Sequence, residues 1–191
     1  MMKPSLWAWN TRTVVATGIG AALYGAASWI NVPIVPDTQL RPAIALLAIL
    51  GALYGPVVGF IAGFIGHVFN DLITSGVVWW SWALGSGITA AFMGLVYMFK
   101  DFNAREGRMN KSHLVSFAVC GIVGIFVSLT FSGLFDILVM GEPHDKIVVE
   151  AVTAGFANAA VFLILGLPAV WAYAKRNRSN TSLSVDRIQN K

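Results

Sequence analysis

The sequence has little charge and a single cysteine. Charged residues make up 12% of the 191 residues, about half the share that is usual in soluble domains, so the chain is not built to face water on all sides. The one cysteine, Cys120, excludes a disulfide framework within the chain, and no Cys/His spacing typical of a metal site occurs. Because it lies in an apolar run, we interpret Cys120 as a small buried residue.

Signatures of nucleotide binding and catalysis are also missing. The sequence has no Gly-x-x-x-x-Gly-Lys phosphate loop, so we expect no nucleotide hydrolysis by this chain itself. His67 and Asp71 are four residues apart, but no metal-binding partner or nucleophile motif accompanies them. We therefore expect no enzyme activity and no cofactor bound by this chain. The net charge of +4 does not indicate nucleic acid, because the charges lie at the ends of apolar segments.

Apolar sequence, in contrast, is abundant, with 57% of the residues hydrophobic. A helix of about 20 mostly apolar residues spans a membrane. The sequence predicts an all-α integral membrane bundle of six transmembrane helices over residues 11–174, after a cytoplasmic segment at 1–10. The expected spans are residues 13–29, 42–54, 56–74, 81–99, 113–140 and 147–173. The second span is short, and only Gly55-Pro56 separates it from the third.

The positions of Lys and Arg predict the orientation of the bundle. They concentrate before the first span, between the fourth and fifth, and after the sixth. With six spans these segments share one side, which the positive-inside rule assigns to the cytoplasm together with both termini. Only Arg41 and Lys146 fall on the outer side. Residues 175–191 are polar and rich in Ser and Asn, so we expect a flexible cytoplasmic tail.

Polar side chains within the spans gather in the outer half of the predicted bundle. His67, Asn70 and Asp71 are spaced to share one helix face. An isolated ionisable group in hydrocarbon costs at least about 2.5–3.5 kcal/mol, so Asp71, Asp136 and Glu150 should face a shared polar interior. The alternative is that these groups only join helices or lie among the lipid headgroups.

Three tryptophans, Trp79, Trp80 and Trp82, follow the polar stripe within four residues. An interfacial aromatic belt accounts for one of them, whereas three beside carboxylates are typical of a site where a flat ring stacks on indole. We predict an outward-open pocket whose carboxylates favour a donor-rich or cationic ligand. The predicted binding residues are His67, Asn70, Asp71, Trp79, Trp80, Trp82, Asp136, Glu150 and Asn158.

The first span carries small residues at helical spacing. Gly18, Ala22 and Ala26 recur every four residues, a spacing that lets a second helix approach closely. Packing inside the bundle and docking of a separate membrane subunit both explain this pattern.

Four segments of the chain resemble the substrate-binding S components of energy-coupling factor (ECF) vitamin transporters: residues 13–23, 53–59, 63–71 and 79–82. The resemblance covers roughly residues 10–175 and is strongest to a family with a member assigned to hydroxymethylpyrimidine, the thiamine precursor. It implies a six-helix bundle in the cell membrane that binds a vitamin or precursor near the outer face. It also implies docking of the first helix on a transmembrane T component that carries two ABC ATPases. Ala22 and Ala26 fulfil the family's Ala-x-x-x-Ala docking pattern, and Gly18 matches it by spacing.

The predicted function is therefore a multi-pass S subunit of an ECF-type ABC importer, in which partner subunits hydrolyse ATP. Two other classes stay open. An autonomous proton-coupled carrier would use His67 and Asp71 as relay groups, although the chain lacks the internal repeat or broken-helix pair that many such carriers show. An integral membrane enzyme or assembly factor would use the same two residues as a metal or acid–base site.

Overall fold

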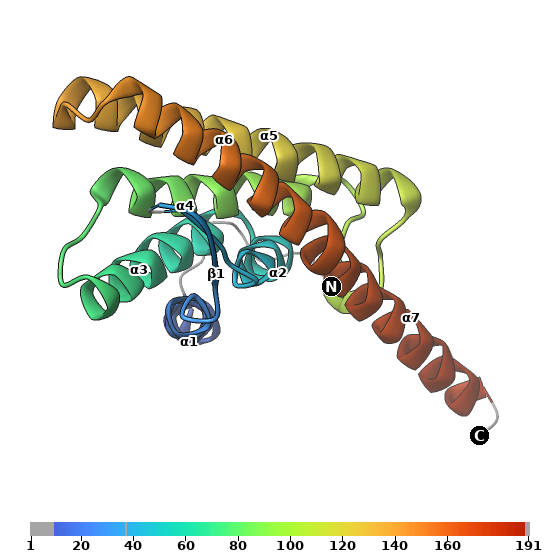
Figure 1. Ribbon diagram of the computed structural model, residues 1–191. Coiled ribbons are helices and arrows are strands. Elements are labelled where there is room, and N and C mark those ends of the chain that lie inside the picture. Colours follow the sequence, from blue (N-terminus) through green and yellow to red (C-terminus); the bar gives the residue numbers. More distant parts are fainter. Residues whose placement is uncertain (1–9, 37, 190–191) are drawn as a thin grey trace.

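A computed structural model of the chain describes residues 10–36 and 38–189 and shows apolar helices with one small hairpin (Figure 1). Its first elements are α1 (Thr11–Ala27), β1 (Val32–Val35), β2 (Thr38–Leu40), α2 (Ile44–Tyr54), α3 (Pro56–Thr74) and α4 (Trp80–Gly94). After α4 come the short 3₁₀ helices η1 (Leu95–Met98) and η2 (Ala104–Glu106), then α5 (Lys111–Phe135). Two π-helical turns, η3 (Asp136–Met140) and η4 (Phe162–Gly166), follow α5 and α6 (His144–Val161), and α7 (Leu167–Gln189) is last.

The structure is helical in each of the six predicted spans. Four helical segments within the described residues are long and apolar enough to cross a membrane: Pro56–Thr74, Trp80–Met98, Lys111–Met140 and His144–Arg178. α1 has 17 residues and α2 only 11, so both are shorter than a typical membrane-spanning helix. The count of six crossings and the cytoplasmic position of both termini stay predictions.

The break between α2 and α3 depends on Gly55-Pro56. Gly55 has φ 91°, a backbone conformation that residues with a side chain rarely adopt. Pro56 follows as the first residue of α3, where its missing N–H is not needed and its fixed φ suits a helix start. The two residues therefore end one helix and begin the next without a loop.

Glycines bring α3 close to the helices on either side. A Cβ on Gly66 would lie 2.6 Å from the carbonyl oxygen of Ala21 in α1, and one on Gly63 would lie 2.8 Å from that of Ser86 in α4. Helices in lipid associate through close packing rather than through the hydrophobic effect, so small residues at the contact are what such a bundle needs.

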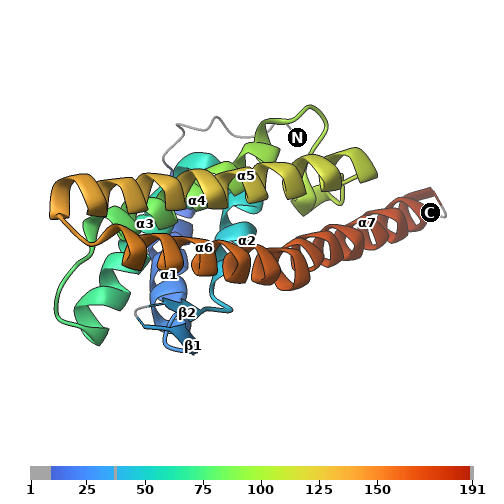
Figure 2. The same ribbon diagram turned by 45° about the horizontal axis from the view of Figure 1, so that its top comes forward.

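The hairpin of β1 and β2 was not predicted from the sequence. The two strands pair antiparallel, with Val32 opposite Leu40 and Pro33 opposite Gln39. Strands of four and three residues, one of them containing a proline, leave no alternating pattern long enough to distinguish them from a loop. The hairpin contacts α6, and Figure 2 shows it at the edge of the bundle beside α1.

The sixth helix is longer than expected. α7 runs from Leu167 to Gln189 and extends away from the other helices (Figure 1). The helix thus includes most of the segment predicted as a flexible cytoplasmic tail, and the flexibility of residues 175–191 stays a prediction. Their polar composition is a poor nucleus for a helix, but extending a helix that already exists adds one hydrogen bond per residue without a nucleation cost.

The core of the bundle lies where α2, α4, α5 and α6 meet. Its largest fully buried side chains include Leu47, Met93, Phe117 and Phe162. Many other large apolar side chains face outward from the same helices, among them Val115, Val119, Val152 and Phe156. A helix that is apolar all round is typical of a membrane span, because lipid can cover its outer face.

Candidate ligand-binding site

A cavity of about 300 Å³ lies between the helices and the hairpin. This volume is near the lower end of the range for small-molecule sites, which is about 300–1,000 Å³. Side chains from α1, the hairpin, α3, α4, α5 and α6 line it. All predicted binding residues except Trp80 are in this lining: His67, Asn70, Asp71, Trp79, Trp82, Asp136, Glu150 and Asn158. The structure thus brings them together, and their contact with a ligand stays a prediction.

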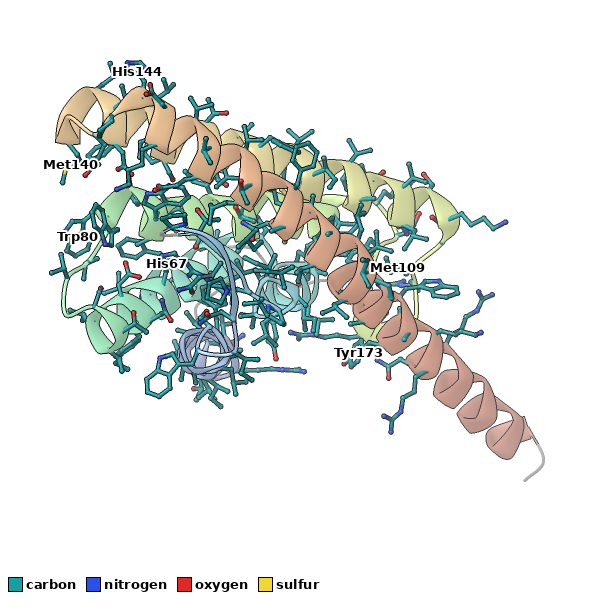
Figure 3. All side chains as sticks on the ribbon, in the orientation of Figure 1. His67, Trp80, Met109, Met140, His144 and Tyr173 are labelled. Atoms are coloured by element: carbon teal, nitrogen blue, oxygen red, sulfur yellow. The ribbon has the colours of Figure 1, made fainter. Side chains whose placement is uncertain are left out.

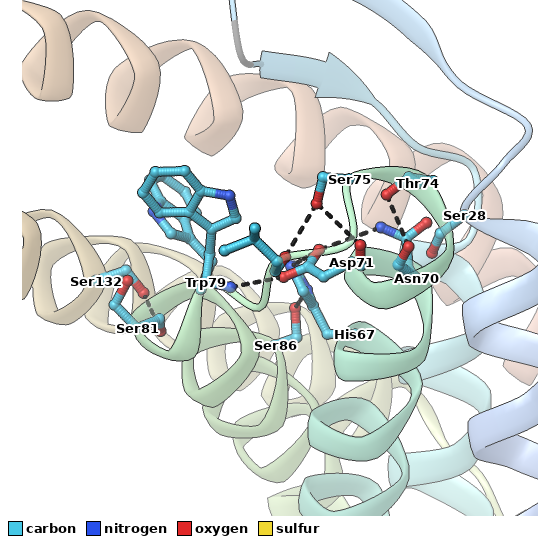
Figure 4. Close-up of polar contacts among 12 residues, drawn as sticks. Ser28, His67, Asn70, Asp71, Thr74, Ser75, Trp79, Ser81, Ser86 and Ser132 are labelled. Carbon is cyan, nitrogen blue, oxygen red and sulfur yellow. Dashed lines mark hydrogen bonds and ion pairs between the residues drawn. The ribbon is translucent and has the colours of Figure 1, made fainter.

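His67 is the centre of a polar chain that crosses three helices (Figure 4). Its Nδ1 lies 2.6 Å from the Ser86 hydroxyl, which is 3.2 Å from the Tyr24 hydroxyl. Its Nε2 lies 3.4 Å from Oδ1 of Asp71. A neutral imidazole fits this chain, because it accepts at one nitrogen and donates from the other. Tyr24 then donates to Ser86, Ser86 donates to His67, and His67 donates to the Asp71 carboxylate.

Asp71 has protein partners on both carboxylate oxygens. The backbone N–H of Trp79 donates to Oδ2 at 3.0 Å, and the Asn70 amide donates to Oδ1 at 3.4 Å beside His67. The bond from Trp79 spans the turn between α3 and α4. Asp71 therefore holds the start of α4 in place, in addition to facing the cavity.

Asp136 forms a second polar cluster on the other side of the cavity. It is 2% exposed. The Ser81 hydroxyl donates to Oδ1 and the Trp82 indole N–H donates to Oδ2, each at 2.6 Å. The Ser132 hydroxyl donates to the Ser81 carbonyl at 2.8 Å. These bonds join the start of α4 to the end of α5, and they hold the ring of Trp82 at the cavity wall.

Glu150 reaches the cavity from α6 and is 7% exposed. The ammonium of Lys146, one turn earlier, lies 3.9 Å from its Oε1 and 3.3 Å from Oε2 of Glu142. The charges of α6 at the cavity are therefore arranged as a group of one cation between two carboxylates.

Trp80 differs from the other predicted binding residues. It does not line the cavity, its side chain is 57% exposed, and its ring packs against Phe64 with centroids 6.3 Å apart. Figure 3 shows it at the end of the bundle, away from His67. The structure therefore does not place Trp80 in the cavity lining, and its contact with a ligand stays a prediction. The helix that starts here turns Trp79 and Trp82 to one side and Trp80 to another.

Several residues that line the cavity were not among the binding residues predicted from the sequence. They come from α1, the hairpin, the segments before and after the hairpin, and α4: Tyr24, Asn31, Thr38, Gln39, Arg41 and Ser86. No pattern in the sequence marked the hairpin residues. Arg41 did carry a signal, because it is one of the two cations that the predicted orientation leaves on the outer side. The other, Lys146, also lines the cavity.

The small residues of α1 face outward. Gly18, Ala22 and Ala26 are exposed, and a Cβ added to Gly18 would meet nothing within 4 Å. The buried face of α1 is made by other residues: Thr17, Gly20, Ala21, Tyr24 and Gly25. Packing inside this chain therefore does not account for the stripe. Its role in docking a partner stays a prediction.

Comparisons with known proteins agree along nearly the whole chain. The family model described as "ECF-type riboflavin transporter, S component" matches residues 8–175. A UPF0397 protein of Streptococcus sanguinis (strain SK36) is 34% identical over 176 residues, which cover 92% of this chain and 97% of the relative. No solved structure gives a significant match.

Proposed function

Because the chain belongs to the family of ECF-type riboflavin transporter S components, we propose that it is the substrate-binding subunit of an ECF importer. It captures a vitamin or vitamin precursor from outside the cell and delivers it inward with ATP that partner subunits hydrolyse. The family is one of transporters and not of enzymes. Family membership and four apolar helices long enough to span a bilayer make this a multi-pass membrane protein.

The observation that carries the proposal is the polar cavity inside an apolar bundle. Buried ionisable groups are expensive within a membrane and are usually functional. Here Asp71, Asp136 and Glu150 are all less than 9% exposed and reach one cavity. The indole rings of Trp79 and Trp82 line the same space, which offers a flat ligand an apolar surface beside hydrogen-bonding groups.

Hydroxymethylpyrimidine is our first candidate substrate. A single substituted pyrimidine ring suits a cavity of about 300 Å³, since this is near the lower limit for ligand sites. Riboflavin is the second candidate, because the description of the matching family names it. Its three fused rings are larger than one pyrimidine ring, so riboflavin would occupy more of the space between the hairpin and the helices.

The partners we propose are a transmembrane T component and two ABC ATPases. The exposed small residues Gly18, Ala22 and Ala26 on α1 offer a face on which a helix of the T component would pack closely. Docking there leaves the cavity open, because its lining comes from the opposite side of α1, through Tyr24.

An autonomous proton-coupled carrier is the alternative. The observation that favours it is the buried chain from Tyr24 through Ser86 and His67 to Asp71, because linked groups of this kind can relay protons. In that case the gradient of protons, and not ATP, would drive uptake.

Transport in liposomes separates these two functions. The full chain is reconstituted alone and with its T component and ATPases, and uptake of labelled hydroxymethylpyrimidine and riboflavin is measured. We expect uptake only with the complete complex and ATP, and none with ATPases unable to hydrolyse ATP. Uptake by the chain alone that follows a pH gradient and is lost in His67→Ala would refute the proposed function.

A further inference from the structure

Two carboxylates of the cavity, Asp71 and Asp136, already accept hydrogen bonds from the protein. Both oxygens of Asp136 accept bonds of 2.6 Å. Both oxygens of Asp71 have donors within 3.4 Å. Each carboxylate oxygen can accept two bonds, so a ligand donor would share Asp71 and Asp136 with the protein donors already there. The number of carboxylates alone therefore does not define the ligand's chemistry.

The two cations of the cavity differ in this respect. Lys146 lies between Glu142 and Glu150. The guanidinium of Arg41, in contrast, forms no hydrogen bond or ion pair with any residue in the part of the chain that the structure describes. A guanidinium carries five N–H donors in a fixed fork. Among the described residues that line the cavity, Arg41 thus offers the largest set of donors with no protein partner.

The backbone around Arg41 fixes its place in the lining of the cavity. It directly follows the last residue of β2, Leu40, and its carbonyl accepts a bond of 3.2 Å from the N–H of Ile44, the first residue of α2. Its charge acts on Tyr24 and Asp71, which line the same cavity. A cation on the predicted outer side does not serve membrane orientation, so a role in ligand binding gives a reason for its position.

We propose that Arg41 binds the substrate directly, and that the substrate presents to it an anionic group or an edge of hydrogen-bond acceptors. The guanidinium fork matches a carboxylate, a phosphate or two neighbouring acceptor atoms on a flat ring. This inference rests on the proposed function, and it adds an acceptor group to a ligand that the carboxylates alone predicted to be cationic or donor-rich. Both candidate substrates carry acceptors: riboflavin has ring carbonyl oxygens, and hydroxymethylpyrimidine has ring nitrogens.

Titration of the purified full chain with the two candidate substrates tests this. Affinities for riboflavin and hydroxymethylpyrimidine are measured in detergent micelles for wild type, Arg41→Gln and Arg41→Lys. We expect Arg41→Gln to weaken the better-binding compound at least about tenfold, as the loss of a charge-assisted bond implies. Arg41→Lys should be intermediate, because it keeps the charge and loses the fork.

Arg108→Gln is the matched control. Arg108 lies outside the cavity and pairs with Glu106 at 2.9 Å, so its loss should leave the affinity unchanged. Thermal unfolding of each variant shows whether it is folded. Wild-type affinity in folded Arg41→Gln or Arg41→Lys would overturn the role of Arg41 and leave the S-subunit function intact. Binding of neither compound by the wild type would contradict the proposed substrates and this inference together.

Discussion

Replacing Asp136 by alanine should be among the most destabilising single changes in the bundle. The substitution removes the carboxylate that accepts two hydrogen bonds of 2.6 Å. The Ser81 hydroxyl and the Trp82 indole N–H then lose their acceptor in a buried site. Each abandoned donor costs about 1–3 kcal/mol. Removing a buried carboxylate also relieves its desolvation cost. We therefore expect the free energy of unfolding to fall by about 2–4 kcal/mol.

Asp136→Asn is the informative companion. Its amide oxygen can still accept from Trp82 while its NH₂ group donates to the Ser81 hydroxyl, so both contacts persist as weaker neutral bonds. We expect it to cost about half as much as the alanine variant or less. Because the bond to Trp82 holds the ring at the cavity wall, alanine should also weaken substrate binding more than asparagine does.

Unfolding in mixed detergent micelles, followed by far-UV circular dichroism, measures these differences. A double-mutant cycle with Trp82→Phe isolates the Asp136–Trp82 bond, and we expect a coupling of about 1 kcal/mol or more. If Asp136→Ala lies within about 0.5 kcal/mol of wild type, as a surface substitution would, the two short bonds do not contribute as argued. Equal effects of alanine and asparagine would refute the reasoning as well.

Three further predictions concern the helix contacts, the docking face and the aromatic wall. Gly66→Ala should lower the free energy of unfolding by about 1–3 kcal/mol, because its Cβ would lie 2.6 Å from the Ala21 carbonyl oxygen. Gly18→Ala is the control, because a Cβ there would meet nothing within 4 Å. Equal melting temperatures for the two variants would contradict this prediction. Ala22→Leu should abolish co-purification with the T component while the isolated chain keeps its substrate affinity, and an intact complex would exclude docking at this face. Trp82→Ala should weaken substrate binding by about tenfold and Trp80→Ala should not, whereas equal losses in the same titration would mean that the cavity is not the site.

The positions of the helices could be predicted from the sequence because apolar run length reports directly on the membrane. The span predicted at 56–74 coincides with α3, since Gly55-Pro56 breaks the apolar run at its start. The helical face of His67, Asn70 and Asp71 also lines the cavity as expected, because a spacing of three and four residues is a property of the helix itself.

Predictions that needed contacts between helices were less successful. Trp80 was grouped with Trp79 and Trp82 because all three are close in sequence, but the start of α4 sends its ring to Phe64 and away from the cavity. The carboxylates were expected to favour a donor-rich or cationic ligand, because their protein partners were unknown. The donors of Asp136 come from Ser81 and Trp82, more than 50 positions away, and no local pattern records such a pairing.

By itself, the sequence determined that this chain is a helical membrane protein, and it located the polar residues at one predicted depth. Both properties follow from local quantities: the length of apolar runs, the period of a helix and the side on which cations accumulate. Only the tertiary structure decided which polar groups are already satisfied and which remain for a ligand. That distinction depends on distances between helices. Asp71 and Asp136 accept bonds from the protein, whereas no described residue uses the donors of Arg41.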